Sequence, residues 1–485
     1  MRRNAPRSVP MKRRLWKLLA FLIALPILLV VVLQWWAASR LTPEAVVRLL
    51  EGSRNCRATV ESVSVRMWGF PARVEMRGLK VRPRDEASKP AVPGETFLNV
   101  DSAVLEVHLW SLLTGKLDVE RANLDGVALQ TVKWREGGNS LKLLLSAPGT
   151  EGRPATLPVT LEDADEIPAP DAALEGEDQP FHISDLPLTS ALKEARISNV
   201  SWTVLNQRKR TVQQFKDANL VLTGMTLDPG NPAEGGRARV AAGTRFIMDS
   251  QRLNLRTLDF ILSLEGDFQL IDPVTGNLNG DLDFSLTVKR GSLINRIPTL
   301  VKLNERLDKL KDSTGLSLDL PPEASLLSDT VIRARLKDKV IRFTDDVFFP
   351  FDTYQLALDK ESWLSLRDEQ HAFSGRLIVS GERSKKTVAT LREFVEQRSG
   401  VLAKILNKTL FDNIVTPDGN VEVPFKSSAE IGRPEVALSD KLLNALKRAG
   451  TEAGKDLLND ALEGGDDIKS LIDAVKGLRK KPAAP

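Results

Sequence analysis

Apolar and polar residues alternate with a period of two along most of the chain after residue 60. Val63, Val65 and Met67 are separated by polar residues. The clearest case is the run 281–288, where Asp, Asp, Ser and Thr alternate with Leu, Phe, Leu and Val. Such alternation gives a strand one buried and one solvated face, which is typical of an antiparallel sheet. Further strands are predicted near 197–205, 218–227, 253–264, 330–343, 354–358 and 373–380.

Four segments have helical character instead. A short helix is predicted from Pro43, with Thr42 as its N-cap and Gly52 at its end. Longer amphipathic helices are predicted at 292–312, 386–411 and 439–485, where apolar residues recur every three or four positions. The simplest interpretation is that they cover the end of the sheet. For the C-terminal segment, which ends in a basic stretch, contact with a membrane surface is the alternative.

An uncharged apolar run lies near the N-terminus, at Leu18–Trp36. As a helix its 19 residues would rise roughly 28 Å, close to the thickness of a hydrocarbon core. The run therefore predicts a single transmembrane anchor. Its residues include Leu18, Phe21, Leu25, Leu29, Val32, Trp35 and Trp36. A cleaved signal peptide is the rival interpretation, which the length of the run and the two terminal tryptophans disfavour.

Charge is distributed unevenly around this anchor. Lys and Arg total 68 against 64 Asp and Glu, but seven of the bases precede the apolar run, and the first acid of the chain is Glu44. By the positive-inside rule the N-terminus is cytoplasmic, and we expect an inner-membrane protein with a periplasmic body. That body keeps 61 bases against 64 acids, so it lacks the basic surplus of a nucleic-acid-binding protein.

Composition also divides the chain. Residues 151–180 hold nine acids, one base and five prolines, which is typical of a flexible linker. We expect a basic tail and anchor at 1–40, a first β region at 41–150, the linker at 151–180, a second β region with helical insertions at 181–438 and a helical C-terminus at 439–485. A weak repeat relates Gly115–Leu124 to Leu192–Val200. It indicates either a sheet extended by repetition or independent convergence on a simple strand pattern.

The sequence supplies little material for catalysis, so no catalytic residue, metal ligand or cofactor is assigned and the protein is predicted not to be an enzyme. Common nucleophile, zinc and dinucleotide motifs are absent from the sequence. Asp281 and Asp283 share one strand face, which a solvated surface explains more simply than an acid–base pair. Cys56 is the single cysteine, and the three histidines, His108, His182 and His371, have no evident partner.

Three features in order along the chain carry a family resemblance. The first is a basic N-terminus, one anchor, a short helix and then strands. The second is the strand at Val104–Leu109, its turn Leu112-Leu113-Thr114-Gly115, and the stretch Gly137–Leu141. The third is the segment Asp418–Phe425, which is followed by Gly432–Asp440. Glu430–Arg433 stands where the family usually has Gly-Thr before the Pro-x-Val segment. In this order they resemble the AsmA-like family of bacterial envelope proteins.

The resemblance implies a long curved antiparallel sheet that forms a groove with an apolar interior, as in chorein-type lipid-transfer proteins. Its implied function is to bind or conduct (phospho)lipid acyl chains for outer-membrane biogenesis. Alternation places seven candidate lining residues on such a groove: Leu105, Val107, Leu109, Leu282, Phe284, Leu286 and Val288. The competing structural interpretation is a closed sandwich core.

The expected partners are membrane lipids, the inner membrane and an outer-membrane or periplasmic protein that completes the path. Two other functions stay open at the level of sequence. One is a membrane-anchored factor that regulates outer-membrane protein assembly or protein targeting to the membrane without moving lipid. The other is an exported enzyme that acts on envelope polymers.

Overall fold

The computed structural model describes residues 40–67, 71–83, 97–112, 114–135, 138–146, 182–232, 235–314, 318, 320–396 and 414–438. They are mainly β with few helices, as predicted. They form two compact units: unit 1 holds the residues up to 255 and 262–282, and unit 2 holds 256–261 and the residues from 283 onwards. No helix in this described part is long and apolar enough to cross a membrane. The predicted anchor, linker and C-terminal helices lie outside it.

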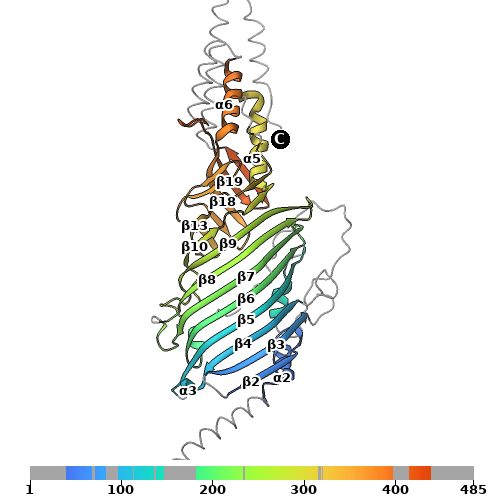
Figure 1. The fold of residues 1–485 in the computed structure, drawn as a ribbon, viewed down its shortest axis with the longest axis vertical. Helices are drawn as coiled ribbons and strands as arrows, with labels where there is room; N and C mark the ends of the chain where they lie inside the picture. Colours follow the sequence, from blue (N-terminus) through green and yellow to red (C-terminus); the bar gives the residue numbers. More distant parts are fainter. Residues whose placement is uncertain are drawn as a thin grey trace, which may run out of the picture. The chain divides into compact units, whose positions relative to one another are not determined.

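Unit 1 is a sheet of long strands, which lie side by side and inclined in Figure 1. Its strands are β1 (Cys56–Thr59), β2 (Ser62–Arg66), β3 (Ala72–Pro83), β4 (Leu98–His108), β5 (Lys116–Lys133), β6 (Thr189–Asn206), β7 (Thr211–Leu227) and β8 (Arg237–Ser250), and β9 (Leu255–Gln269) contributes to both units. Its helices are α2 (Pro43–Ser53), α3 (Leu109–Leu112), α4 (Ser140–Leu145) and the single turn η2 (Ile183–Asp185). Thr42 caps α2 as predicted, because its side chain accepts a hydrogen bond from the Ala45 N–H.

One pair of strands corrects the prediction of a purely antiparallel sheet. β5 and β6 are parallel neighbours, with Lys116 opposite Thr189 and Lys133 opposite Asn206. Parallel strands need a long connection that returns the chain to the starting end, and residues 134–188 supply one. The two segments of the predicted repeat therefore lie on neighbouring strands, where paired residues such as Lys116 and Thr189 are 73 positions apart.

A line of left-handed residues crosses the sheet and changes which side chains face each side. The line comprises Gly78 (φ 62°), Gly126 (φ 65°), Asn199 (φ 55°) and Asp217 (φ 50°) on β3, β5, β6 and β7. Such a residue interrupts the pleat, so alternation resumes one position later. Asn199 tolerates this conformation because its amide donates to Asp125, at 2.7 Å. A hydrogen bond from the Ser198 hydroxyl, together with the one from Asn199, holds the pKa of Asp125 below its usual range.

Unit 2 has shorter strands and two longer helices. Its elements are β10 (Leu282–Val288, from Asp283 onwards), β11 (Leu293–Asn295), α5 (Pro298–Thr314), β12 (Glu323–Ser325), β13 (Thr330–Lys337), β14 (Val340–Phe343), β15 (Val347–Pro350), β16 (Gln355–Leu358), β17 (Trp363–Ser365), β18 (Gln370–Val379), α6 (Gly381–Glu396), β19 (Val421–Glu430) and β20 (Arg433–Leu438). β18, β19 and β20 pair in antiparallel order, and α5 contacts β20. Leu303 and Leu307 of α5 are fully buried, so this helix covers a closed core.

The predicted helix at 292–312 begins later than expected. Ile294 lies on β11 and is buried there, and α5 starts only at Pro298, a residue suited to a first helical turn. The helix predicted from 386 begins earlier, at Gly381. The first difference arises because the few apolar residues at 293–297 fit either period, and the second because the first turns of α6 are polar and carry no hydropathy signal.

Gly126 should be hard to replace. A Cβ there would lie within 2.7 Å of the Asp101 side chain, and a left-handed conformation costs an L-residue roughly 1–2 kcal/mol. We expect Gly126→Ala to lower the protection of β5 and β6 amides in hydrogen exchange about tenfold or more. Gly52→Ala in α2, where the added Cβ meets nothing within 4 Å, is the control and should leave exchange unchanged. Equal effects of the two substitutions would refute the special role of Gly126.

His371 should make unit 2 sensitive to mild acid. It is 2% exposed, its Nε2 lies 2.8 Å from the Ser427 hydroxyl, and burial holds its pKa below the usual range. The unfolded chain therefore binds a proton more readily, and stability should decrease as pH falls through about 6.5 and level off below the folded pKa. The melting temperature of unit 2 should therefore fall between pH 7.5 and 5.5 in the wild type. We expect His371→Gln to make this melting temperature less dependent on pH. His182→Asn, which keeps an N-cap acceptor at η2, should retain the wild-type slope.

Candidate functional site

Six strands of unit 1 bring apolar side chains into two rows on one face of the sheet. Backbone pairing aligns each row from β3 to β8 without a charged residue. The first row is Val74, Leu105, Ala122, Ala195, Leu222 and Val240; the second is Met76, Ala103, Leu124, Ile197, Leu220 and Ala242. We call these twelve residues the apolar face. At about 4.8 Å per strand it extends roughly 24 Å across the sheet.

None of the twelve side chains is buried. Leu105 is 41% exposed and Leu124 is 38% exposed, and the other ten are intermediate. By contrast, Leu307 and Leu377 in unit 2 are completely buried. The apolar face is therefore only partly covered, and a contiguous apolar surface that stays partly exposed is a candidate interaction site.

The opposite face of the same strands is charged. A row of side chains alternates in sign or polarity from β3 to β8: Arg73, Glu106, Arg121, Glu194, Thr223 and Arg239. Glu106 pairs with Arg73 at 3.4 Å and with Arg121 at 3.7 Å. The neighbouring Glu75 accepts from Arg77, which lowers the pKa of this carboxyl. The sheet thus has one solvated and one apolar side.

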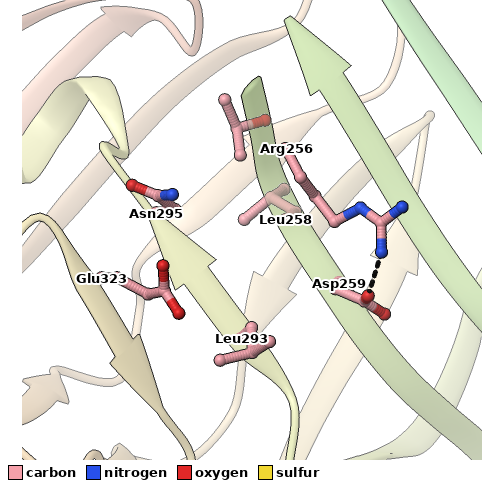
Figure 2. Close-up of a pocket in the computed structure, with 7 residues that line it drawn as sticks. Arg256, Leu258, Asp259, Leu293, Asn295 and Glu323 are labelled. Carbon is pink, nitrogen blue, oxygen red and sulfur yellow. Dashed lines mark hydrogen bonds and ion pairs between the residues drawn. The ribbon is translucent and has the colours of Figure 1, made fainter. Parts of the chain in front are cut away.

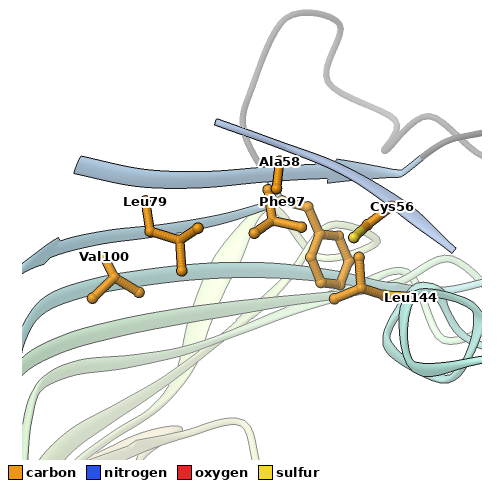
Figure 3. Packing of buried hydrophobic residues seen from close by; sticks show 7 residues of the cluster. Cys56, Ala58, Leu79, Phe97, Val100 and Leu144 are labelled. Atoms are coloured by element: carbon orange, nitrogen blue, oxygen red, sulfur yellow. The ribbon is translucent and has the colours of Figure 1, made fainter. Parts of the chain in front are cut away.

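One part of the apolar side is covered. In Figure 3 Phe97 lies between the residues of β1 and Leu144 of α4, and Leu79 and Val100 belong to the same cluster. Val47 and Leu50 of α2 pack against it as well. Met76 of the apolar face also contacts this cluster, which places the cluster and the two rows on the same side of the sheet.

Beyond the line of left-handed residues, a third row carries aromatic rings. It runs Val81, Leu98, Leu129, Trp202, Phe215 and Phe246. The ring of Trp202 stacks on that of Phe215 with centroids 5.3 Å apart, and Phe246 follows at 5.0 Å. These three rings, the aromatic row, are only half-buried, so they extend the accessible apolar surface toward the ends of β6, β7 and β8.

The structure distributes the seven predicted lining residues over both units. Leu105 belongs to the apolar face, and Val107 is half-buried on the same strand, after a bulge. Leu109 does not continue the strand, because it begins α3. Leu282, Phe284 and Leu286 are half-buried on β10, where Val288 is 2% exposed. The seven predicted anchor residues lie outside the described part of the chain.

Sequence reasoning missed every member of the apolar face except Leu105, namely Ala103 on β4 and the residues on β3 and β5 to β8. Their signal is present but broken: Leu124 and Val127, like Ile197 and Val200, are three positions apart instead of two. A pure period-two search fails at each such step, because Gly126 and Asn199 reset the alternation.

The polar residues singled out in the sequence are engaged in ordinary contacts. Asp283 forms a two-pronged ion pair with Arg335, at 2.7 and 2.9 Å, which lowers the pKa of that carboxyl. His108 lies 2.8 Å from Glu120, and Cys56 is buried in the cluster of Figure 3. Within the described residues, no three His, Cys, Asp or Glu side chains come together as a metal site would require.

Unit 2 contains a small hollow of about 150 Å³ beside β9, β11 and β12, shown in Figure 2. Asp259 at its wall is 4% exposed and accepts a hydrogen bond from Arg256 at 2.8 Å. This internal ion pair already satisfies the charged group, and the volume is below that of usual ligand pockets. The hollow is therefore a weaker candidate than the apolar face.

No protein-family model, curated protein or solved structure matches this chain at a significant level. The apolar face of unit 1, rather than any relative, is therefore the basis for assigning a function.

Ile197→Asp should leave the fold intact. Its side chain is half-exposed on the apolar face, so a carboxylate there keeps access to water and costs about 1 kcal/mol or less. Leu307→Asp, in the fully buried core of unit 2, should cost about 4 kcal/mol or more. Limited proteolysis of both variants tests this difference. Rapid digestion of the Ile197→Asp protein would show that this face is ordinary core.

Proposed function

We propose that this protein binds the acyl chains of membrane phospholipids on the apolar face of unit 1 and conducts them through the bacterial envelope. The observation that carries the proposal is the pair of unbroken apolar rows across six strands, of which no member is buried. A face of this kind is unstable in water without an occupant, since each methylene removed from water contributes about 0.8 kcal/mol.

The two sides of the sheet make lipid a better occupant than a folded protein partner. Acyl chains need no matching polar groups, and the apolar face offers none, whereas protein interfaces carry about one hydrogen bond per 100–200 Å². The charged row around Glu106 keeps the opposite side in water. A lipid held this way has its chains on one face only and can move from row to row without breaking a specific contact.

The proposal includes the cellular setting that the sequence suggests. The run at 18–36 anchors the chain in the inner membrane, and the β units lie in the periplasm, next to the lipids that they bind. An apolar face of roughly 24 Å is shorter than a bilayer is thick, so a periplasmic or outer-membrane partner protein carries the lipids further. The reaction is physical transfer, without catalysis or a cofactor.

Photo-crosslinking in cells tests lipid binding with the full-length chain. A photoreactive phenylalanine analogue replaces Leu124 or Ile197 on the apolar face, and Arg121 or Arg196 on the charged face serves as the matched control on the same two strands. We expect phospholipid adducts, detected by mass spectrometry, from the first two positions and not from the controls. Introducing Ile197→Asp should lower the yield at position 124 about tenfold, because a charge would interrupt the second row.

Adducts of equal yield from both faces, or adducts with protein alone at positions 124 and 197, would refute the proposal. The second result would favour a membrane-anchored assembly factor that holds a protein on this face.

A further inference from the structure

Two turns at one end of the unit 1 strands carry an unusual concentration of positive charge. Residues 207–210 join β6 to β7 and contain Arg208, Lys209 and Arg210; residues 251–254 join β8 to β9 and contain Arg252. Neither turn contains an acid. We call them the basic turns. At the other end of these strands, the described residues of the β7–β8 turn carry Asp228 and no base.

The basic turns lie side by side, because the Gln251 N–H donates to the Arg210 carbonyl at 2.8 Å. Arg208, Arg210 and Arg252 are exposed. In the described part of the chain no carboxylate forms an ion pair with any of the three, whereas most arginines on the charged face, such as Arg73, are paired. These guanidinium groups are therefore available to an anion from outside the chain.

The basic turns follow directly after the aromatic row. Phe215 is five residues from Arg210 along β7, a distance of about 17 Å in an extended strand. One leaflet of a bilayer has a hydrocarbon depth of about 15 Å. A phospholipid whose acyl chains contact the aromatic row therefore has the length to place its phosphate at the basic turns.

We infer that the basic turns bind the headgroup of anionic phospholipids whose acyl chains lie on the aromatic row; this inference rests on the proposed function. Guanidinium groups bind phosphate oxygens through paired hydrogen bonds. The three exposed arginines, which form no ion pair within the described part of the chain, also repel the ammonium group of a zwitterionic headgroup, so the turns select lipids of net negative charge. The apolar face binds any acyl chain, and the basic turns determine the selectivity for the headgroup.

The test uses the full-length chain in its membrane, with the photoreactive phenylalanine analogue at position 215 within the aromatic row. Mass spectrometry of the adducts gives the ratio of anionic phospholipid to phosphatidylethanolamine, divided by the same ratio in the membrane. In the wild type we expect this normalised ratio to show enrichment of anionic lipid. In the double variant Arg208→Gln/Arg252→Gln the ratio should fall about fivefold for each arginine that is removed. Arg57→Gln/Lys216→Gln removes two exposed bases elsewhere in unit 1 and should leave the ratio unchanged.

Each other outcome is decisive. An unchanged ratio in the basic-turn variant, or an equal fall in the control variant, would overturn the inference and leave the proposed function standing. Absence of any lipid adduct from position 215, with adducts still present from position 124, would also overturn it. Absence of lipid adducts from both positions would overturn the proposed function as well. The phosphatidylethanolamine adducts of the variant report that its fold and its acyl-chain contact persist.

Discussion

Backbone pairing between β3 and β8 is the interaction on which the rest of unit 1 depends. Because each strand is held in register with the next, apolar residues that lie far apart in sequence, such as Val74 and Val240, fall on one line. The same pairing collects the charged residues on the other side. Side-chain chemistry alone would give six amphipathic strands; the register turns them into two continuous surfaces of opposite character.

The two units solve the problem of an apolar sheet face differently. Unit 2 covers its sheet with α5, whose Leu303 and Leu307 complete a closed core. Unit 1 packs α2 and α4 around Phe97 and against the adjoining end of β5, and the twelve residues of its apolar face stay at least partly exposed. Among the described residues, unit 2 therefore has a closed core, whereas unit 1 keeps a partly exposed apolar face; an open groove stays a prediction.

Local pattern predicted the β-rich fold, the cap at Thr42 and one member of the apolar face, Leu105. It failed where contacts between residues distant in sequence determine the strand pairing or the burial of a side chain. Nothing near β5 or β6 indicates that the two strands pair in parallel, and the polar sequence before His371 gives no sign that Ser427, 56 residues away, lies beside it in a core. Most of the candidate face was missed because left-handed residues such as Gly126 shift the alternation by one position, a backbone effect that a hydropathy pattern does not record.

The parallel pair of β5 and β6 has a consequence for how such a chain can change its length. Each residue of one strand lies beside the residue 73 positions later, with Ala122 beside Ala195 and Leu124 beside Ile197. Duplication of a block of this length would set a third strand in the same alignment, and both surfaces would continue without a step. Whole blocks would therefore lengthen the sheet and keep its two sides, whereas an insertion of an odd number of residues within a strand would exchange them.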